Sequence, residues 1–358
     1  MKAAVCYEFG KPLVVEEVDI DPPQKGEVKV RIAATAICHS DIHVIKGDLG
    51  GRLPLVPGHE SAGYIEEVGE NVTSVKPGDA VVISLIASCR RCLQCVSGRP
   101  ELCEARWPLS RESRLHNKKG ESLIHMTKTA SFAEYAIVDE SQAVQIPEDM
   151  PMDRAALLSC GVITGFGAVV NTAQVEALSS VVVIGVGGVG LNSVQGAALS
   201  GAYPVIVVDI LDNKLEAARA FGATHTVKAS DENAVNIVKQ LTSGRGADYV
   251  FVTVGSTAAI QQGFSMSRPG GTTVIVGLPP RTEAVTLPTV LAWNERKVIH
   301  SSMGSTRLSV VVPKLVALYQ AGRLKLDELI TNRYPLEQIN EAIEAVEKGE
   351  ALRNVIMF

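Results

Sequence analysis

The sequence has few of the features that mark membrane, exported or nucleic-acid-binding chains. No apolar run approaches the roughly 18 residues needed to cross a bilayer, and the N-terminal residues contain no apolar core of a signal peptide. The net charge of −5 does not favour nucleic acid or an anionic membrane surface. We therefore expect a cytoplasmic globular protein with neither a membrane nor a nucleic-acid partner.

Internal repeats and low-complexity segments are also absent from the 358 residues, which excludes solenoid and fibrous architectures. Hydrophobic residues make up 46% of the chain and charged residues 20%, which is typical of a globular protein. A chain of this length is too long for one ordinary domain. Two domains are the natural expectation.

The centre of the sequence, residues 179–209, has the pattern of a βαβ unit that binds a dinucleotide. A β-branched run at 181–184 leads directly into Gly185, Gly187 and Gly190, which fit the G-x-G-x-x-G fingerprint, and a small-residue helical pattern follows. The first glycine allows a tight turn, the second lets the backbone approach a pyrophosphate, and the third lets the helix pack closely on the strand. The helix N-terminus would offer its free N–H groups to the phosphates.

The second strand of this unit ends on Asp209, 19 residues after Gly190. A carboxylate here would accept hydrogen bonds from the adenosine ribose and would repel a 2′-phosphate, which favours NAD over NADP. The alternative is a glycine-rich turn in an α/β domain that binds no nucleotide.

Strand and helix patterns alternate after residue 179, which predicts a parallel sheet wound on both faces. Residues 152–172 have helical spacing, and the N-terminal part has strand patterns, with 104–130 expected to be a long surface loop. We expect a dinucleotide-binding domain at 162–302, inserted into a mostly β domain made of 1–161 and 303–358. The expected strands of the inserted domain are 181–184, 205–208, 225–228, 248–254, 272–276 and 297–301.

Four of the seven cysteines crowd into 15 residues as Cys89, Cys92, Cys95 and Cys103. Four thiolates at this spacing can close a tetrahedral zinc site with no position open to a substrate, which is a structural role. The alternatives are four unrelated free thiols or a zinc ribbon that binds nucleic acid. The negative net charge weighs against the ribbon.

Cys38 and His59 lie in two polar motifs, Cys-His-Ser-Asp and Gly-His-Glu. Two cysteines and one histidine can hold zinc with the fourth position open, which is a catalytic arrangement. Cys160 lies about a hundred residues further on, so spacing alone does not join it to the other two. Taken alone, Cys6, Cys38 and Cys160 each fit a small buried hydrophobe better than a metal ligand.

These motifs, in this order, resemble those of the zinc-dependent alcohol dehydrogenases of the medium-chain dehydrogenase/reductase superfamily, over essentially the whole chain. The resemblance implies an α/β protein with a GroES-like, mostly β catalytic domain and a doubly wound Rossmann domain. It also implies reversible hydride transfer between NAD and an alcohol, and two zinc ions per chain, one catalytic and one structural.

The resemblance also implies residue roles. Cys38, His59 and Cys160 would hold the catalytic zinc, with Glu60 as an acid that can approach it and Asp41 orienting His59. Ser40 and His43 would relay the proton. The residues implied at the cofactor are His39, Thr164, Gly185, Gly187, Gly188, Val189, Gly190, Asp209, Lys214, Val254, Leu278 and Arg353.

The implied substrate channel contains Ser40, Leu85 and Met126. Leucine leaves more room than the aromatic residue common at its position, and methionine adapts to irregular shapes. We expect medium-sized or bulky apolar alcohols, primary or secondary, and the matching aldehydes or ketones. The long interval from Cys103 to Cys160 resembles that of dimeric members, so we expect a homodimer.

Three alternatives stay open at this point. A glutathione-dependent formaldehyde dehydrogenase would carry more acidic residues than the single Asp48 in the stretch 48–53. A polyol dehydrogenase of the same superfamily is not excluded by the cysteine arrangement. A non-enzymatic relative would have no need of an open zinc site.

Overall fold

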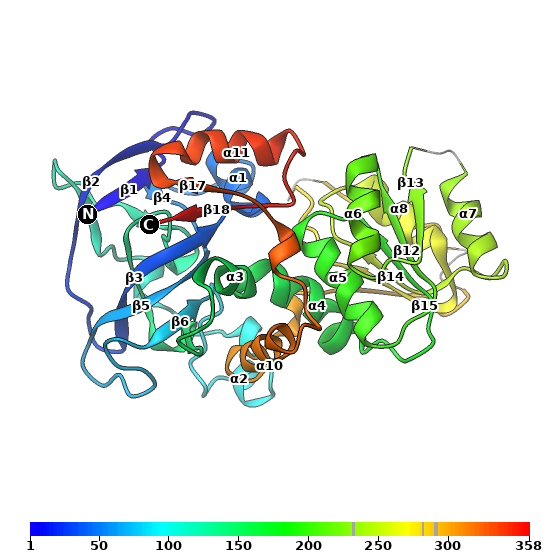
Figure 1. Cartoon of the computed structure of the whole chain (residues 1–358), viewed down its shortest axis with the longest axis horizontal. Helices are drawn as coiled ribbons and strands as arrows, with labels where there is room; N and C mark the ends of the chain where they lie inside the picture. Colours follow the sequence, from blue (N-terminus) through cyan, green and yellow to red (C-terminus); the bar gives the residue numbers. More distant parts are fainter. Residues whose placement is uncertain (231–232, 281–282, 290–292) are drawn as a thin grey trace. The chain divides into compact units, whose positions relative to one another are not determined.

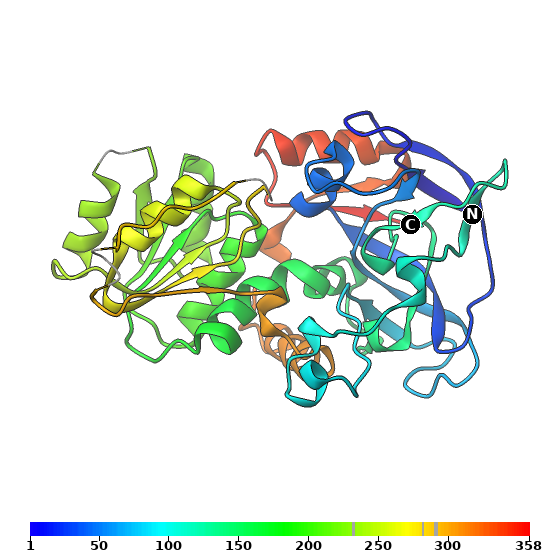
Figure 2. The same ribbon diagram turned by 180° about the vertical axis from the view of Figure 1, so that it is seen from behind.

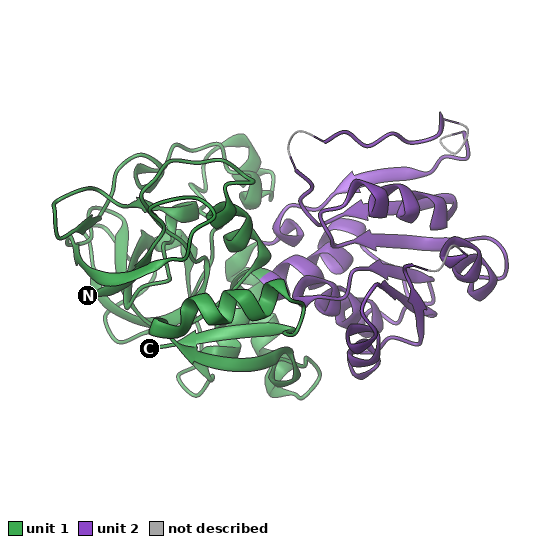
Figure 3. Cartoon of the chain, turned by 90° about the horizontal axis from the view of Figure 1, so that it is seen from above, with its two compact units in different colours: residues 1–160, 307–358 green, residues 161–306 purple. Residues whose placement is uncertain are grey.

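The computed structural model describes residues 1–230, 233–280, 283–289 and 293–358. The chain forms two compact units, coloured separately in Figure 3. Unit 1 contains residues 1–160 and 307–358, and unit 2 contains residues 161–306. Both ends of the chain therefore contribute to the same unit.

Unit 2 is built on a six-stranded sheet in which every neighbouring pair of strands is parallel. The strands, in spatial order, are β13 (His225–Lys228), β12 (Val205–Asp209), β11 (Val181–Ile184), β14 (Ala247–Val252), β15 (Ser267–Ile275) and β16 (Lys297–His300). The strand order changes direction between β11 and β14, and ligands of open α/β sheets bind at such a point. The predicted parallel sheet is confirmed, with strand ends shifted by up to five residues.

Helices cover this sheet because its strands are apolar on both sides. All four residues of β11 are buried, as expected for a central strand of a parallel sheet. The helices of unit 2 are α4 (Ile163–Gly167), α5 (Gly188–Leu199), α6 (Asp212–Ala220), α7 (Ala234–Leu241) and α8 (Thr257–Met266). Val238 of α7 and Ile260 of α8 join the core cluster that contains Val182 and Val250. Figure 2 shows α8 lying over the sheet.

Unit 1 is mostly β. Its largest sheet has the spatial order β10 (Ala143–Gln145), β6 (Ala80–Ile83), β5 (Glu60–Val68), β3 (Glu27–Ala36), β18 (Arg353–Met357) and β17 (Ile330–Pro335), with β9 (Tyr135–Asp139) also paired to β3. Antiparallel pairing of Ile356 with Thr35 joins the end of the chain to its beginning. Figure 1 shows this long β3–β5 ribbon and α11 above β17 and β18.

Two smaller sheets and five α-helices complete unit 1. One sheet consists of β1 (Lys2–Val5), β2 (Val14–Ile20) and β7 (Leu115–Asn117). The other consists of β4 (Leu55–Val56) and β8 (Ile124–His125). The helices are α1 (His39–Lys46), α2 (Leu93–Val96), α3 (Met152–Leu157), α10 (Leu308–Gln320) and α11 (Ile339–Glu347).

A continuous helical run, Met152–Ala173, confirms the helix predicted at 152–172. It is long and apolar enough to span a membrane by length and composition alone, although it contains no uninterrupted apolar run of about 18 residues. Asp153 and Arg154 lie at its start, and only uncharged Ser, Thr and Asn interrupt the rest. Because 78% of its most apolar window is buried inside the protein, packing in the core accounts for its composition.

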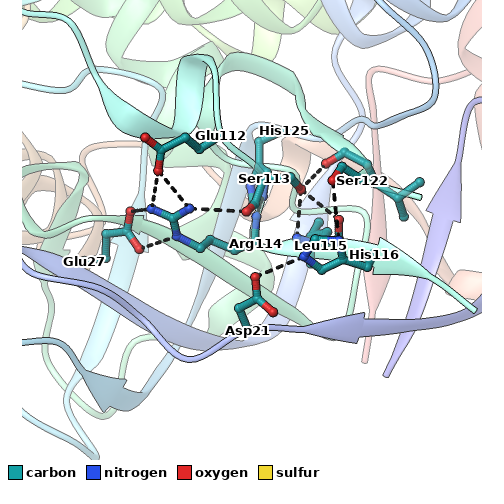
Figure 4. Close-up of polar contacts among 10 residues, drawn as sticks. Asp21, Glu27, Glu112, Ser113, Arg114, Leu115, His116, Ser122 and His125 are labelled. Atoms are coloured by element: carbon teal, nitrogen blue, oxygen red, sulfur yellow. Dashed lines mark hydrogen bonds and ion pairs between the residues drawn. The ribbon is translucent and has the colours of Figure 1, made fainter. Parts of the chain in front are cut away.

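Residues 104–130 are not the surface loop that the sequence predicted. They contribute β7, β8 and the buried side chains of Leu115 and Leu123. Arg114, only 3% exposed, donates from Nε and Nη2 to the carboxylate of Glu27, at 3.0 and 2.9 Å (Figure 4). The prediction failed because a buried arginine looks like a surface residue in sequence, and its partner lies 87 residues away.

Candidate functional site

The structure brings Cys89, Cys92, Cys95 and Cys103 together at one end of unit 1, with their sulfur atoms all within 4.8 Å of one another. All four are free thiols. The Sγ atoms of Cys89 and Cys95 are 3.9 Å apart and those of Cys92 and Cys103 are 4.0 Å apart. Four thiolates at 2.3 Å from one zinc would stand roughly 3.8 Å apart, so this cluster fits a tetrahedral zinc ion.

Backbone N–H groups support thiolate character in this cluster. Those of Glu104 and Cys95 lower the pKa of the Cys92 thiol to about 6, and the Cys92 N–H donates to Cys89 Sγ at 3.3 Å. Burial raises the pKa of Cys103. A metal bound by the cluster would favour the deprotonated form of that thiol.

A second set of potential metal ligands is formed by Cys38, His59, Glu60 and Cys160, all buried, with ligand atoms within 4.8 Å of one another. Cys38 lies at the N-terminus of α1, and His59 and Glu60 lie at the start of β5. A hydrogen bond with Cys160 and the proximity of His59 hold the pKa of Cys38 well below its usual range, against the effect of burial. Two sulfurs and one imidazole nitrogen are a donor set that zinc prefers.

Asp41 connects the N-terminus of α1 to the start of β5. Its carboxylate accepts hydrogen bonds from the N–H of Cys38 at 2.9 Å, from the N–H of Gly58 at 3.2 Å and from His59 Nδ1 at 2.8 Å. Burial alone would lower the pKa of His59, but Asp41 and Cys38 raise it to about 10. Because Nδ1 is engaged, only Nε2 of His59 is available to a metal.

Cys160 lies in a π-helical turn, Leu158–Val162, inside the long helical run. Such turns place side chains where a regular α-helix would not, and they are frequent at functional sites. Ser84 Oγ donates to the carbonyl of Ser159 at 2.6 Å, which ties the end of β6 to this turn. The sequence showed neither the turn nor this contact.

The structure also places Arg353 where sequence reasoning did not expect it. Its guanidinium forms an ion pair with the Glu60 carboxylate, and both side chains are buried. The resemblance assigned Arg353 to the cofactor and Glu60 to the metal, without relating them. The first residue of β18 and the first residue of β5 are joined here because β18 and β5 flank β3.

Ser40 and His43 both lie on α1. Ser40 Oγ is 3.2 Å from Cys38 Sγ and 3.4 Å from His59 Nε2, so this hydroxyl is beside the ligands. His43 is half-exposed, and its Nδ1 is 2.7 Å from Asp48 Oδ2. Within the described residues, no direct hydrogen bond joins Ser40 to His43.

The glycine loop of unit 2 has the geometry that its sequence requires. Gly185 has a φ of +83°, and a Cβ on Gly190 would lie 1.9 Å from the Gly185 carbonyl oxygen, so α5 packs against the strand only with glycine there. A Cβ on Gly187 would meet nothing within 4 Å, so the space over this residue is open. Gly188 and Val189 begin α5.

Asp209 ends β12 beside this loop. Its Oδ2 accepts a hydrogen bond from the N–H of Val186 at 2.7 Å, and its Oδ1 accepts one from the N–H of Leu211 at 3.0 Å. Val254 and Leu278 follow β14 and β15, at the same carboxyl edge of the sheet, and both are exposed. This edge therefore has the form of a dinucleotide site.

The remaining predicted residues are more scattered. In unit 2, Lys214 lies on α6, and Thr164 of α4 donates from Oγ1 to Met303 Sδ at 3.7 Å. In unit 1, His39 is exposed at the start of α1, and Leu85 is half-buried after β6. Met126 is only 6% exposed and belongs to a core cluster with Ile42 and Phe132.

Comparisons with known proteins agree with this geometry. Residues 24–148 match the alcohol dehydrogenase GroES-like domain, and residues 188–320 match the zinc-binding dehydrogenase family. An NDMA-dependent alcohol dehydrogenase of Amycolatopsis methanolica is 39% identical over 366 residues, which span 99% of this chain and 98% of that protein.

Solved structures are similar along the whole chain. A benzyl alcohol dehydrogenase of Acinetobacter calcoaceticus is 31% identical, with a TM-score of 0.92, over 100% of this chain and 99% of that one. An alcohol dehydrogenase zinc-binding domain protein of Burkholderia ambifaria is 32% identical, with a TM-score of 0.95, over 100% and 98% of the two chains.

Proposed function

Since the chain belongs to the zinc-dependent alcohol dehydrogenases of the medium-chain dehydrogenase/reductase superfamily, we propose that it oxidises medium-sized or bulky apolar alcohols with NAD as the hydride acceptor. That it is a zinc-dependent alcohol oxidoreductase follows from the family. The observation that carries the proposal is that the potential ligand atoms of Cys38, His59 and Cys160, from three segments of the chain, lie within 4.8 Å of one another.

The residues of unit 1 at this site would have different roles. Cys38, His59 and Cys160 would hold zinc, which would supply a Lewis acid for the alcohol oxygen, and bound NAD would supply the hydride acceptor. Asp41 fixes the ring of His59, and Arg353 neutralises the buried Glu60. Because that carboxylate is neutralised, the surroundings of the three ligands carry less negative charge, which would favour a developing alkoxide.

We propose Ser40 as a proton relay, because its hydroxyl lies next to Cys38 Sγ and His59 Nε2. It would accept the alcohol proton while releasing its own hydroxyl proton towards solvent, so that it stays neutral. His43, half-exposed and paired with Asp48, would pass protons to solvent. The four-cysteine cluster would hold a second zinc ion with a structural role, which makes two zinc ions per chain.

NAD is supported by Asp209. A carboxylate already held by the N–H of Val186 would present negative charge at the ribose position and would disfavour a 2′-phosphate. One relative is described as NDMA-dependent, so NDMA belongs among the acceptors to be compared. We propose NAD as the preferred acceptor over NADP, and initial rates of alcohol oxidation with NAD, NADP and NDMA test this preference.

The substrate class is tested by initial rates with NAD on ethanol, hexanol, benzyl alcohol, geraniol and sorbitol, and on formaldehyde with glutathione. One solved relative is a benzyl alcohol dehydrogenase, which supports aromatic alcohols. We expect kcat/KM to rise from ethanol to hexanol, since each buried methylene contributes about 0.8 kcal/mol. A preference for ethanol or sorbitol, or activity only on formaldehyde with glutathione, contradicts this substrate class.

We also propose that the protein is a homodimer and acts in the cytoplasm, on the basis of the resemblance alone. Light scattering of the purified protein tests the first proposal, and a tetramer mass contradicts it. Cell fractionation tests the second.

A further inference from the structure

A cavity of about 360 Å³ in unit 1 lies beside the four-cysteine cluster and has no part in the function described above. Its walls come from the turn before β3, the cysteine loop, the start of the segment 104–130, η3 (Met126–Lys128) and the end of β9. Five basic side chains line it: Lys25, Arg90, Arg91, Arg106 and Lys128. This is an unusual concentration of positive charge in a chain whose net charge is −5.

The three carboxylates in the same wall already have partners. Glu27 is held by two nitrogens of Arg114 (Figure 4). Asp139 accepts from the N–H and the hydroxyl of Ser141, at 2.9 and 2.6 Å. Glu140 accepts from the N–H of Thr73 and from the N–H and hydroxyl of Ser74.

The five cations form no ion pair among the described residues, although Arg90 is near enough to Asp139 and Glu140 to interact with both electrostatically. Across residues 1–230, 233–280, 283–289 and 293–358, no carboxylate lies within ion-pair distance of any of them. Lys128 is the most informative, because it is half-buried. Withdrawal from water disfavours the charge of this lysine, and the nearby Cys103 offsets that effect only in part, so an anion in the cavity would stabilise it.

The backbone around Lys128 has an uncommon conformation that its surroundings support. Thr127, Lys128 and Ala130 all have positive φ, at 50°, 65° and 55°. Thr129 Oγ1 anchors the segment to the Gly58 carbonyl at 2.8 Å. Residues kept in this sparsely populated conformation need support from their surroundings and concentrate at binding sites. Lys128 is therefore held at the cavity wall.

The zinc-loaded cysteine cluster would add a net charge of about −2 nearby. Glu27 is neutralised by Arg114, so the negative charges left at the cavity are those of the zinc cluster, Asp139 and Glu140. Together they are fewer than the five positive charges of the wall. We propose that this cavity binds a small molecule that carries at least two phosphate or carboxylate groups. A volume of about 360 Å³ suits a small molecule, and Trp107 in the wall offers a flat apolar surface to its body.

Isothermal titration calorimetry of the zinc-loaded full chain tests the site. Fructose 1,6-bisphosphate and tricarballylate, one with two phosphates and one with three carboxylates, are the probes. The variants are Lys128→Gln and Arg106→Gln, and the matched control is Arg111→Gln, an exposed arginine of the same segment that does not line the cavity. The zinc content of every variant is measured before titration.

At low ionic strength we expect at least one probe to bind with a millimolar or lower Kd and to bind more weakly as salt is added. The probe that binds shows whether phosphate or carboxylate is preferred. Lys128→Gln and Arg106→Gln should each weaken binding about tenfold, while Arg111→Gln leaves it within twofold. No binding by either probe, or an equal loss in all three variants with unchanged zinc content, overturns the proposal.

Discussion

The carboxylate of Asp41 and the imidazole of His59 are joined by a hydrogen bond of 2.8 Å, and neither side chain is exposed by more than 1%. This bond determines which nitrogen of His59 can face a metal. The same carboxylate holds Cys38 and Gly58 through their N–H groups. One residue therefore positions two of the three proposed ligands of the catalytic zinc.

Asp41→Asn should lower the affinity of the catalytic site for zinc by about 10–100-fold, because the amide keeps the shape but loses the charge that makes His59 a stronger donor. Titration of the metal-free protein with zinc, in competition with a chelator, measures this. Asp48→Asn is the control, since the carboxylate of Asp48 pairs with the half-exposed His43 and not with a proposed zinc ligand. Equal zinc affinities in both variants contradict the role of Asp41.

Cys95→Ala should lower the thermal stability of the protein, because the free energy of zinc binding to the four-cysteine cluster is lost from folding. A loss of about 3 kcal/mol lowers Tm by roughly 6–12 °C in units of this size. Cys6→Ala is the matched control, since Cys6 is buried without a metal partner. Calorimetry that finds no larger effect for Cys95→Ala than for the control argues against a structural zinc.

The buried ion pair of Arg114 and Glu27 gives a prediction about stability alone. Arg114→Met should reduce the free energy of unfolding by about 3–5 kcal/mol, because Glu27 remains buried without its partner. Adding Glu27→Leu should restore most of that loss. Glu112→Gln, on the exposed side of the same arginine, should change little. Urea unfolding that leaves Arg114→Met as stable as the wild type contradicts the buried pair.

His125 predicts how stability depends on pH. Burial and the nearby Arg114 lower its pKa from 6.5 to about 4 in the folded chain. Its folded pKa lies below the unfolded value, so the unfolded chain binds the proton more tightly. Stability is therefore retained above pH 6.5 and lost as the pH falls from 6.5 towards 4, by up to about 3 kcal/mol. His125→Gln should flatten this part of the profile in urea unfolding, and an unchanged slope contradicts the assignment.

The strands and the glycine loop of unit 2 could be predicted from the sequence, because local patterns determine them. Residues 181–184 are β-branched throughout and are followed by glycines at fixed spacing, and a central parallel strand requires both features. The four-cysteine cluster, Cys89 to Cys103, could be predicted for the same reason, because its members are close in sequence. The family that the motifs suggested is confirmed by relatives that match along the whole chain.

Contacts between distant segments could not be predicted in this way. Arg114 is buried only because Glu27 reaches it from β3, and its charge made residues 104–130 look like a surface loop. Arg353 meets Glu60 because β18 is paired to β3. Cys160 reaches Cys38 from a π-helical turn that has no recognised sequence pattern. In each case the partner is set by the tertiary fold rather than by spacing along the chain.

The most direct test of the central claim is the rate of NADH formation from benzyl alcohol and NAD by Cys160→Ser, measured together with its zinc content. We predict that the wild type binds two zinc ions and forms NADH, and that Cys160→Ser keeps its fold and the zinc of the four-cysteine cluster but loses at least about a thousandfold in kcat/KM, which corresponds to about 4 kcal/mol of transition-state stabilisation. A Cys160→Ser variant with wild-type activity, or a wild type that forms no NADH with any alcohol of the panel, would contradict the account.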